Sequence, residues 1–335
     1  MSPPKTSPMT SPFDRGIFTL SLDFELAWGS RDLMADPQSL IEQALVTRAE
    51  IFERLLTLLV DNGVCATWAT VGHLFLAEAW RKDGILHPDI VPPRHAWRQA
   101  PWFDGVPEGT EEEHPAFYGR SLLLRLKDAD QDIGSHSFSH PIFGDSGCSR
   151  ENADTDLARC VAAAAELGIP LRSFVFPRNQ TGHVDLLKKH GFTCWRGNEP
   201  VWYRRDRIPG PVRRIAHFAE VIVARSPPTV LPVRDECGLW CIPASGSFLP
   251  ISGVRRGIPI RQRVRRAMRG TEQAARNRGI SHFWFHPINL SDSPDRLLTA
   301  IQRIVEHAAR LRDQGRLEIL SMAEIARRAS LRSPA

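Results

Sequence analysis

The sequence predicts an α/β fold, a distorted (β/α) barrel of about seven strands that is closed or nearly closed. Three observations lead to this prediction. Segments typical of strands and of helices alternate along the chain, and polar residues follow several of the predicted strands. The length of 335 residues would allow two average domains, but α/β barrels of this length commonly form one. A parallel barrel with its site at the carboxyl ends of the strands therefore explains the pattern best.

The predicted elements follow one another in a regular order. The β-rich run IFTLSLDF at residues 17–24 comes first, and apolar residues at helical spacing follow over residues 40–61. Further strands are predicted at 64–71, 132–135, 172–176, 192–195, 281–286 and 317–320, and further helices at 73–81, 155–167, 184–190, 294–313 and 322–328. This alternation is typical of parallel βα units.

Three stretches fall outside the alternation. Residues 1–15 are rich in Pro, Ser and Thr and predict a disordered N-terminal tail before a barrel domain over residues 16–330. Residues 83–120 are dense in Pro, Trp and His, whereas residues 198–277 are irregular and then basic. We interpret both as insertions between barrel elements, of the kind that shapes a substrate pocket.

The composition excludes a membrane-embedded protein. Hydrophobic residues make up 42% and charged residues 24%, and no run of 18 apolar residues occurs. The N-terminal stretch lacks the apolar core of a secretory signal, and the six cysteines form no C-x-x-C pair. Cys237 and Cys241 are close in sequence, but a core position explains them better than a metal site. These features predict a cytoplasmic protein.

Two short motifs carry the residue types of a metal hydrolase. In DIGSHSFSH, the four-residue spacing of His136 and His140 would bring both imidazoles to one face of a helical turn. In SLDFELAWG, Asp23 and Glu25 would point to the same side of an extended strand. Each group alone could be structural, because a histidine pair is often not a ligand pair and carboxylates also cap helices or form salt bridges. Together they predict a divalent cation bound by two imidazoles and a carboxylate.

The candidate residues also share a position relative to the strands. Asp23 and Glu25 lie at the end of the first predicted strand, His136 and Arg178 each follow a later one, and His286 ends the strand at 281–286. Because the carboxyl ends of parallel strands meet at one face of a barrel, these side chains are expected to converge.

Five motifs in this order resemble the polysaccharide deacetylase family, the NodB-homology or carbohydrate esterase family 4-like enzymes. They are SLDFE, ATWATVG, GSHSFSH, SFVFPRN and FWFHPINL, and the resemblance covers residues 17–325. It implies the NodB-type barrel and metal-dependent removal of an acyl group from an amino sugar, with zinc or a similar divalent ion as cofactor.

The resemblance also implies roles for individual residues. Asp23 would be the general base, Glu25, His136 and His140 the metal ligands, and His286 the general acid. The family's first motif has two adjacent Asp residues, whereas this chain has Phe24 between two acids, so the reverse assignment of base and ligand stays open. Arg178 would hold the base ionised, unless it lies in a simple surface turn.

Two further features bear on the substrate. Trp28, Trp68 and Trp284 near strand ends would line a sugar or acyl pocket or belong to the core. Residues 255–278 hold nine arginines against the single acid Glu272. This segment is either a solvated amphipathic helix or a docking site for an anion, such as the phosphates of a nucleotide- or lipid-linked precursor in surface-glycan biosynthesis. Docking of that kind is compatible with peripheral membrane contact.

Two other functions are compatible with parts of this pattern. One is a metal-independent amidohydrolase of the same barrel, similar to the allantoinases. The other is a non-catalytic binder of anionic glycans or nucleic acid, which the complete set of acid, base and ligand types disfavours. No nucleic-acid-binding motif accompanies the arginines, so no specific nucleic acid partner is predicted. Both an acetyl and a formyl group fit the predicted chemistry.

Overall fold

The computed structural model describes residues 13–32, 36–201, 212, 219–248, 251 and 253–332. Of the predicted tail over residues 1–15, residues 1–12 lie outside this range. Phe13 is buried in a cluster with Ile17 and Val230, so the packed part of the chain begins before residue 16. Among the described residues, none of the helices combines the length and apolar character that crossing a bilayer requires.

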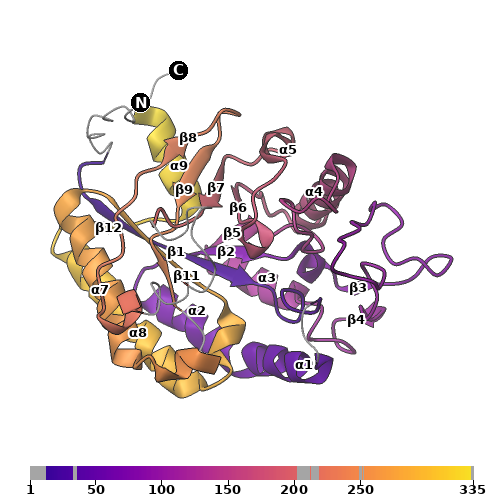
Figure 1. The fold of residues 1–335 in the computed structure, drawn as a ribbon, viewed down its shortest axis with the longest axis horizontal. Helices are drawn as coiled ribbons and strands as arrows, with labels where there is room; N and C mark the ends of the chain where they lie inside the picture. Colours follow the sequence, from indigo (N-terminus) through magenta and orange to yellow (C-terminus); the bar gives the residue numbers. More distant parts are fainter. Residues whose placement is uncertain are drawn as a thin grey trace.

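A largely parallel sheet forms the centre of the molecule (Figure 1). Its strand order is β10-β11-β1-β2-β5-β6-β7-β9-β8, and β12 pairs with the start of β1. β8 is antiparallel to β9, and a separate two-stranded sheet joins β3 and β4. The bounds are β1 (Gly16–Phe24), β2 (Thr67–Thr70), β3 (Glu78–Ala79), β4 (Gly109–Thr110), β5 (Asp132–Ser135), β6 (Ser173–Phe174), β7 (Cys194–Gly197), β8 (Val233–Arg234), β9 (Trp240–Pro243), β10 (Gly246–Ser247), β11 (Ile280–Phe285) and β12 (Leu317–Ile319).

One short segment joins the two ends of this sheet. β9 pairs with β7 and β10 pairs with β11, and only Ala244 and Ser245 separate β9 from β10. The N–H of Ala244 donates to the carbonyl of Gly197 (2.9 Å), and that of Ser245 donates to the carbonyl of His282 (2.8 Å). Residues 240–247 therefore act as one strand that closes the barrel between β7 and β11. With β1, β2, β5, β6, β7 and β11 this gives seven strand positions, which confirms the predicted barrel.

Helices cover the outside of the sheet. Figure 1 shows α1, α2, α7 and α8 along one side and α4 and α5 on the other. The helices are α1 (Pro37–Val46), α2 (Phe52–Asp61), α3 (Arg120–Asp128), α4 (Arg150–Ala165), α5 (Val184–Lys189), α7 (Ile260–Asn277), α8 (Pro294–Asp313) and α9 (Met322–Arg332), with short helical turns η1 (Thr47–Ile51), η2 (Gly72–Phe75), η3 (Pro177–Asn179), η5 (Gly253–Gly257) and η6 (Pro287–Leu290).

Local signals explain where two of these helices begin. The Asp36 side chain accepts from the N–H groups of Gln38 and Ser39, and Pro37 occupies the first turn of α1. Ser149 and Asn152 form a capping box at the start of α4. Both caps satisfy N–H groups that have no partner inside the helix.

The predicted helix at residues 73–81 is reduced to the single turn η2. The N–H groups of Gly72 and His73 donate to the carbonyls of Ser137 (2.7 Å) and Phe138 (3.0 Å). A Cβ on Gly72 would lie 2.8 Å from the Cα of Phe138, so the two backbones approach too closely for a side chain here. This long-range pairing replaces the helix that the local sequence favours.

Residues 198–277 do not form one insertion. They contain β9 and β10, which close the barrel, and α7, which leads into β11. The strands have four and two residues, too few for an alternating pattern to show in the sequence. Residues 83–120 match the expected insertion more closely, since β4 is the one strand within them and α3 begins at Arg120.

Candidate active site

β1 delivers two carboxylates to one end of the barrel. All nine residues of β1 are buried, Asp23 precedes its last residue, and Glu25 follows directly. Both acids point to the same side, as predicted, and Asp23 and Glu25 are only 2% and 4% exposed. Two buried carboxylates are costly unless positive groups or hydrogen bonds compensate them, so their partners define the site.

Glu25 contacts both histidines of the DIGSHSFSH motif. Its Oε1 atom lies 2.9 Å from Nε2 of His136 and 3.3 Å from Nε2 of His140. The sequence predicted that the two imidazoles share a helical turn, and this prediction is wrong. They lie on a loop after β5 in which Ser137 (φ 63°) and His140 (φ 64°) adopt left-handed conformations. The predicted metal ligands thus lie together, but a loop with left-handed residues brings them there instead of a helical turn.

The chemistry of this cluster fits a cation. Nδ1 of His136 lies 2.7 Å from the carbonyl oxygen of Val175, which can only accept a hydrogen bond, so Nδ1 carries the proton. In neutral His136 the lone pair of Nε2 then faces a carboxylate oxygen at 2.9 Å. Two acceptors at this distance require a proton or a metal ion between them. An imidazole held through its other nitrogen is also the usual arrangement of a metal-ligating histidine.

The acid–base properties of the cluster agree with a site for positive charge. Burial opposes the charge on Glu25, but His286 and the hydrogen bonds with His136 and His140 hold the pKa of Glu25 well below its usual value. Burial also opposes a charge on His136, yet the hydrogen bond to Glu25 raises the pKa of His136 above its ordinary value. Burial lowers the pKa of His140, which keeps that imidazole neutral and able to act as a ligand.

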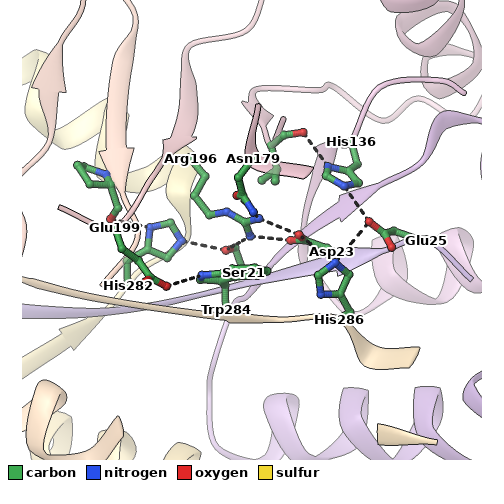
Figure 2. Close-up of polar contacts among 12 residues, drawn as sticks. Ser21, Asp23, Glu25, His136, Asn179, Arg196, Glu199, His282, Trp284 and His286 are labelled. Atoms are coloured by element: carbon green, nitrogen blue, oxygen red, sulfur yellow. Dashed lines mark hydrogen bonds and ion pairs between the residues drawn. The ribbon is translucent and has the colours of Figure 1, made fainter. Parts of the chain in front are cut away.

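Asp23 lies beside the cluster in a different environment. Arg196 donates from Nη1 to Oδ1 of Asp23 (2.6 Å) and from Nη2 to Oδ2 (2.7 Å), and both side chains are buried (Figure 2). Burial opposes the charge on Asp23, but Arg196 and His286 outweigh it and hold the pKa of Asp23 below its usual value. Asp23 is therefore an ionised hydrogen-bond acceptor next to the cluster.

Arg178 does not occupy the place that the sequence suggested. It forms an ion pair with Asp32, and its guanidinium lies 4.7 Å from the ring centroid of Trp97. Arg178 sits in η3 with φ 52°, a left-handed conformation. Arg196, from the end of β7, contacts Asp23 instead. The sequence does contain a feature that could have indicated this contact: in CWRGN, Arg196 follows the strand predicted at 192–195, so it belongs to the same end of the barrel as Asp23.

Other side chains hold Arg196 in position. Its Nη1 donates to Oγ of Ser21 (3.0 Å), its Nη2 donates to Oδ1 of Asn179 (3.1 Å), and its guanidinium lies over the ring of Trp284 at 4.3 Å. Nε2 of His282 lies 2.9 Å from Oγ of Ser21. The buried Asp23–Arg196 pair thus belongs to a network that also includes the partly exposed Asn179 and Trp284, and the sequence motifs did not indicate this network.

His286 completes the group at the mouth of the site. It follows β11, and its Nε2 atom lies 3.6 Å from Oδ2 of Asp23 and 3.6 Å from Oε1 of Glu25. Its side chain is 29% exposed, more than any other member of the cluster, so it faces the solvent side. Figure 2 shows His286 beside both carboxylates.

Of the three tryptophans considered for a pocket, one reaches the site. Trp284 packs against Arg196 and lies 5.6 Å from His286 between ring centroids. Trp28 and Trp68 are fully buried in the main hydrophobic core.

The sheet and the helices around it define the class of architecture, a distorted (β/α) barrel, as expected. No family model matches the sequence, and a search of curated proteins found no match. Solved structures match over nearly the whole chain. A protein assigned as a polysaccharide deacetylase from Mycobacterium smegmatis has a TM-score of 0.62 and 15% identity, covering 98% of this chain and 96% of its own.

Two further structures show the same likeness. A second protein so assigned, from Pseudomonas aeruginosa PAO1, has a TM-score of 0.62 and 11% identity, covering 95% of this chain and 92% of its own. The allantoinase PuuE has a TM-score of 0.60 and 12% identity, covering 99% and 96%. At these identities the comparisons show a common fold.

Proposed function

We propose that this protein is a metal-dependent hydrolase that removes an N-acyl group, acetyl or formyl, from an amino sugar. One observation carries the proposal: Glu25, His136 and His140 place a carboxylate oxygen and two imidazole nitrogens within 4.8 Å of one another, beside Asp23 and His286. Zinc sites of hydrolases use such a carboxylate and two imidazoles and leave one position open. The fold shared with proteins assigned as polysaccharide deacetylases supports the same class of reaction.

The residues divide the reaction between them. A divalent cation held by Glu25, His136 and His140 would supply Lewis acidity, which lowers the pKa of water and offsets negative charge on an amide oxygen. Asp23, kept ionised by Arg196, would accept a proton from the attacking water. His286, whose Nε2 lies 3.6 Å from Asp23 at the solvent side, would donate a proton to the departing amine. This arrangement favours Asp23 as base and Glu25 as ligand, because Glu25 contacts both imidazoles.

The arginine-rich segment supports a phosphorylated sugar, such as a nucleotide- or lipid-linked precursor. Arg263 and Arg266 are buried, so the segment is not a uniformly solvated face. Arg255 and Arg256 are exposed in η5, just before α7. Because helices of a (β/α) barrel run opposite to its strands, the start of α7 lies at the same end as His286. Asp292 lies six residues beyond His286. Burial raises the pKa of Asp292, and the positive charge of Arg256 opposes this rise. Arg256 is therefore close enough to Asp292 to affect it, at the same end of the barrel as His286.

The test measures metal content and amine release together. The purified chain is stripped with a chelator, reloaded with Zn²⁺, and assayed with N-acetyl and N-formyl amino sugars, free and phosphorylated. We expect activity to disappear with the metal and to return on reloading, and Glu25→Gln to abolish both metal binding and activity. Glu42→Gln, in the exposed part of α1, is the matched control.

Three outcomes would contradict the proposal. Activity that persists after complete removal of metal would identify a metal-independent amidohydrolase. Metal binding without turnover of any amino sugar tested would indicate a non-catalytic binder of anionic glycans. Absence of metal binding in the wild-type chain would remove the observation on which the proposal rests.

A further inference from the structure

The loop that carries the two histidines is held by contacts that the proposed reaction does not use. Its backbone is unusual, because Ser137 and His140 both have positive φ angles and neither is a glycine. Such conformations persist only where the surroundings impose them. What imposes this one determines where the imidazole of His140 points.

Asp156 is the side chain that contacts this loop most extensively. It lies on α4, 16 residues beyond His140 in the sequence, and it is 1% exposed. Its Oδ1 accepts from the N–H of Phe138 (2.6 Å), and its Oδ2 accepts from the N–H (3.0 Å) and the hydroxyl (2.6 Å) of Ser139. One buried carboxylate thus accepts three hydrogen bonds from two consecutive residues between the histidines.

The hydroxyl of Ser139 connects this clamp to the insertion. It donates to Asp156 and accepts from Nε1 of Trp102 (2.9 Å), which is 3% exposed and lies within residues 83–120. The carbonyls of Ser137 and Phe138 in turn accept from the N–H groups of Gly72 and His73. Two sets of hydrogen bonds therefore hold the loop: its carbonyls accept from η2, and its N–H groups donate to the Asp156 carboxylate.

An oxygen-only acceptor is needed at this position. Three donors converge on Asp156, and an asparagine would turn an NH₂ group toward at least one of them. A buried donor that loses its acceptor is costly, so the loop would relax away from its present conformation. His140 belongs to that loop, and its Nε2 would then leave its position beside Glu25.

We propose that Asp156, assisted by Ser139, is a positioning residue that fixes the loop of residues 136–140 for metal binding. It touches neither the cation nor the substrate and acts through the backbone of Phe138 and Ser139. This inference rests on the proposed metal-dependent function, because it states how the metal site of that function is shaped.

The experiment measures metal affinity, which a residue with only a general structural role would leave unchanged. Zn²⁺ affinity is determined by competition with a chromophoric chelator, and the visible absorption of the Co²⁺-loaded protein reports the ligand geometry. For Asp156→Asn we expect Zn²⁺ affinity to fall about 10- to 100-fold, the range found for residues that support metal ligands, and the Co²⁺ spectrum to change. Ser139→Ala, which removes the hydroxyl alone, should weaken binding less.

Asp154→Asn is the matched control. Asp154 lies on the same helix, two residues away, and bonds Lys189 and His190 rather than the loop, so its substitution should leave metal affinity and the Co²⁺ spectrum unchanged. Thermal unfolding and circular dichroism establish that each variant is folded.

The outcomes separate this inference from the proposed function. If the wild-type chain binds no metal, both fail. If it binds metal and folded Asp156→Asn binds it equally well with the same Co²⁺ spectrum, only the positioning role is overturned. Should Asp156→Asn not fold, Ser139→Ala decides: weaker Zn²⁺ binding supports the role, and unchanged binding refutes it.

Discussion

Arg196 holds the carboxylate of Asp23 with two parallel hydrogen bonds of 2.6 and 2.7 Å, and both residues are 2% exposed. A planar guanidinium matches a carboxylate in this bidentate way, which a lysine cannot reproduce. The pair joins β1 to the end of β7 across the interior of the barrel. It therefore ties the ionisation of Asp23 to the integrity of the fold.

Replacing Arg196 by glutamine should affect both stability and activity. Removing one partner of a buried ion pair costs about 3–5 kcal/mol, because the remaining charge is left without compensation. We expect the free energy of unfolding in urea to fall by that amount at pH 7. Since Arg196 lowers the pKa of Asp23, its loss should also move the acidic limb of the pH–rate profile to higher pH. Arg178 pairs with Asp32, so in Arg178→Gln the acidic limb should stay in place. A limb that moves in Arg178→Gln and not in Arg196→Gln would show that Arg178 keeps Asp23 ionised.

Gly29→Ala should disable the metal site although it replaces none of the proposed ligands. A Cβ at position 29 would lie 1.6 Å from Oε2 of Glu25, so the carboxylate must move. We expect Zn²⁺ affinity to fall by about 10-fold or more while the chain remains folded. Gly119→Ala is the control, because its Cβ would approach no atom closer than 3.4 Å. Equal Zn²⁺ affinity in both variants would show that Glu25 does not bind the cation from its present position.

His286→Gln should separate catalysis from metal binding. If His286 donates the proton to the leaving amine, kcat should fall about 10²- to 10⁴-fold, the usual contribution of a general acid. Zn²⁺ affinity should change little, because the ligand set of Glu25, His136 and His140 is intact. Measurement of kcat and metal content in one preparation checks this. A variant that keeps its kcat would assign the acid to another group.

Arg255 and Arg256 should matter only for phosphorylated substrates. Their joint replacement by glutamine is expected to raise KM for a phosphate-bearing amino sugar and to leave kcat unchanged, because neither residue belongs to the catalytic group. Arg303→Gln, exposed on α8, serves as control. Steady-state kinetics at low and high salt test the point, since an attraction between exposed charges weakens with ionic strength. An unchanged KM at low salt would exclude the segment from substrate binding.

Because His282 is buried, we expect the folded chain to lose stability at acidic pH. Burial, with Arg196 nearby, lowers its pKa to about 3 from an ordinary 6.5, so it is neutral when folded and takes up a proton on unfolding below pH 6.5. Stability from this group is complete above pH 6.5 and is lost as the pH falls toward 3, which amounts to about 2 kcal/mol at pH 5. His282→Gln should therefore destabilise the chain less at pH 5 than at pH 7, by about that difference. If the urea midpoints of the wild type and of His282→Gln differ by the same amount at pH 5 and at pH 7, His282 does not have a lowered pKa in the folded chain.

The sequence predicted the parts of the fold whose pattern is local. The helix at 294–313 coincides with α8, and the strand at 281–286 matches β11 within one residue. Asp23, Glu25, His136, His140 and His286 also come together as expected, because each lies at the carboxyl end of a parallel strand or in the segment after it, and such strand ends meet.

What the sequence did not reveal depends on distant contacts. Arg196 reaches Asp23 across 173 residues, and only the closed barrel brings β7 opposite β1. The turn η2 is short because its N–H groups bond the histidine loop. Arg178 looked suitable by motif, yet its positive φ directs it to Asp32. In each case the structure depends on a contact between residues far apart in the sequence, which a local sequence pattern does not show.

Asp14 and Arg332 form an ion pair of 2.7 Å, so the segment that leads into β1 and the end of α9 lie side by side. β1 starts at Gly16 on this side and carries Asp23 at its far end, so the described chain enters and leaves at the pole of the barrel opposite its chemistry. A domain fused directly before Asp14 or directly after Arg332 would join the barrel at the pole away from the reacting groups. A circular permutant that links the two ends and opens the chain at an exposed helix connection should keep its catalytic pole intact.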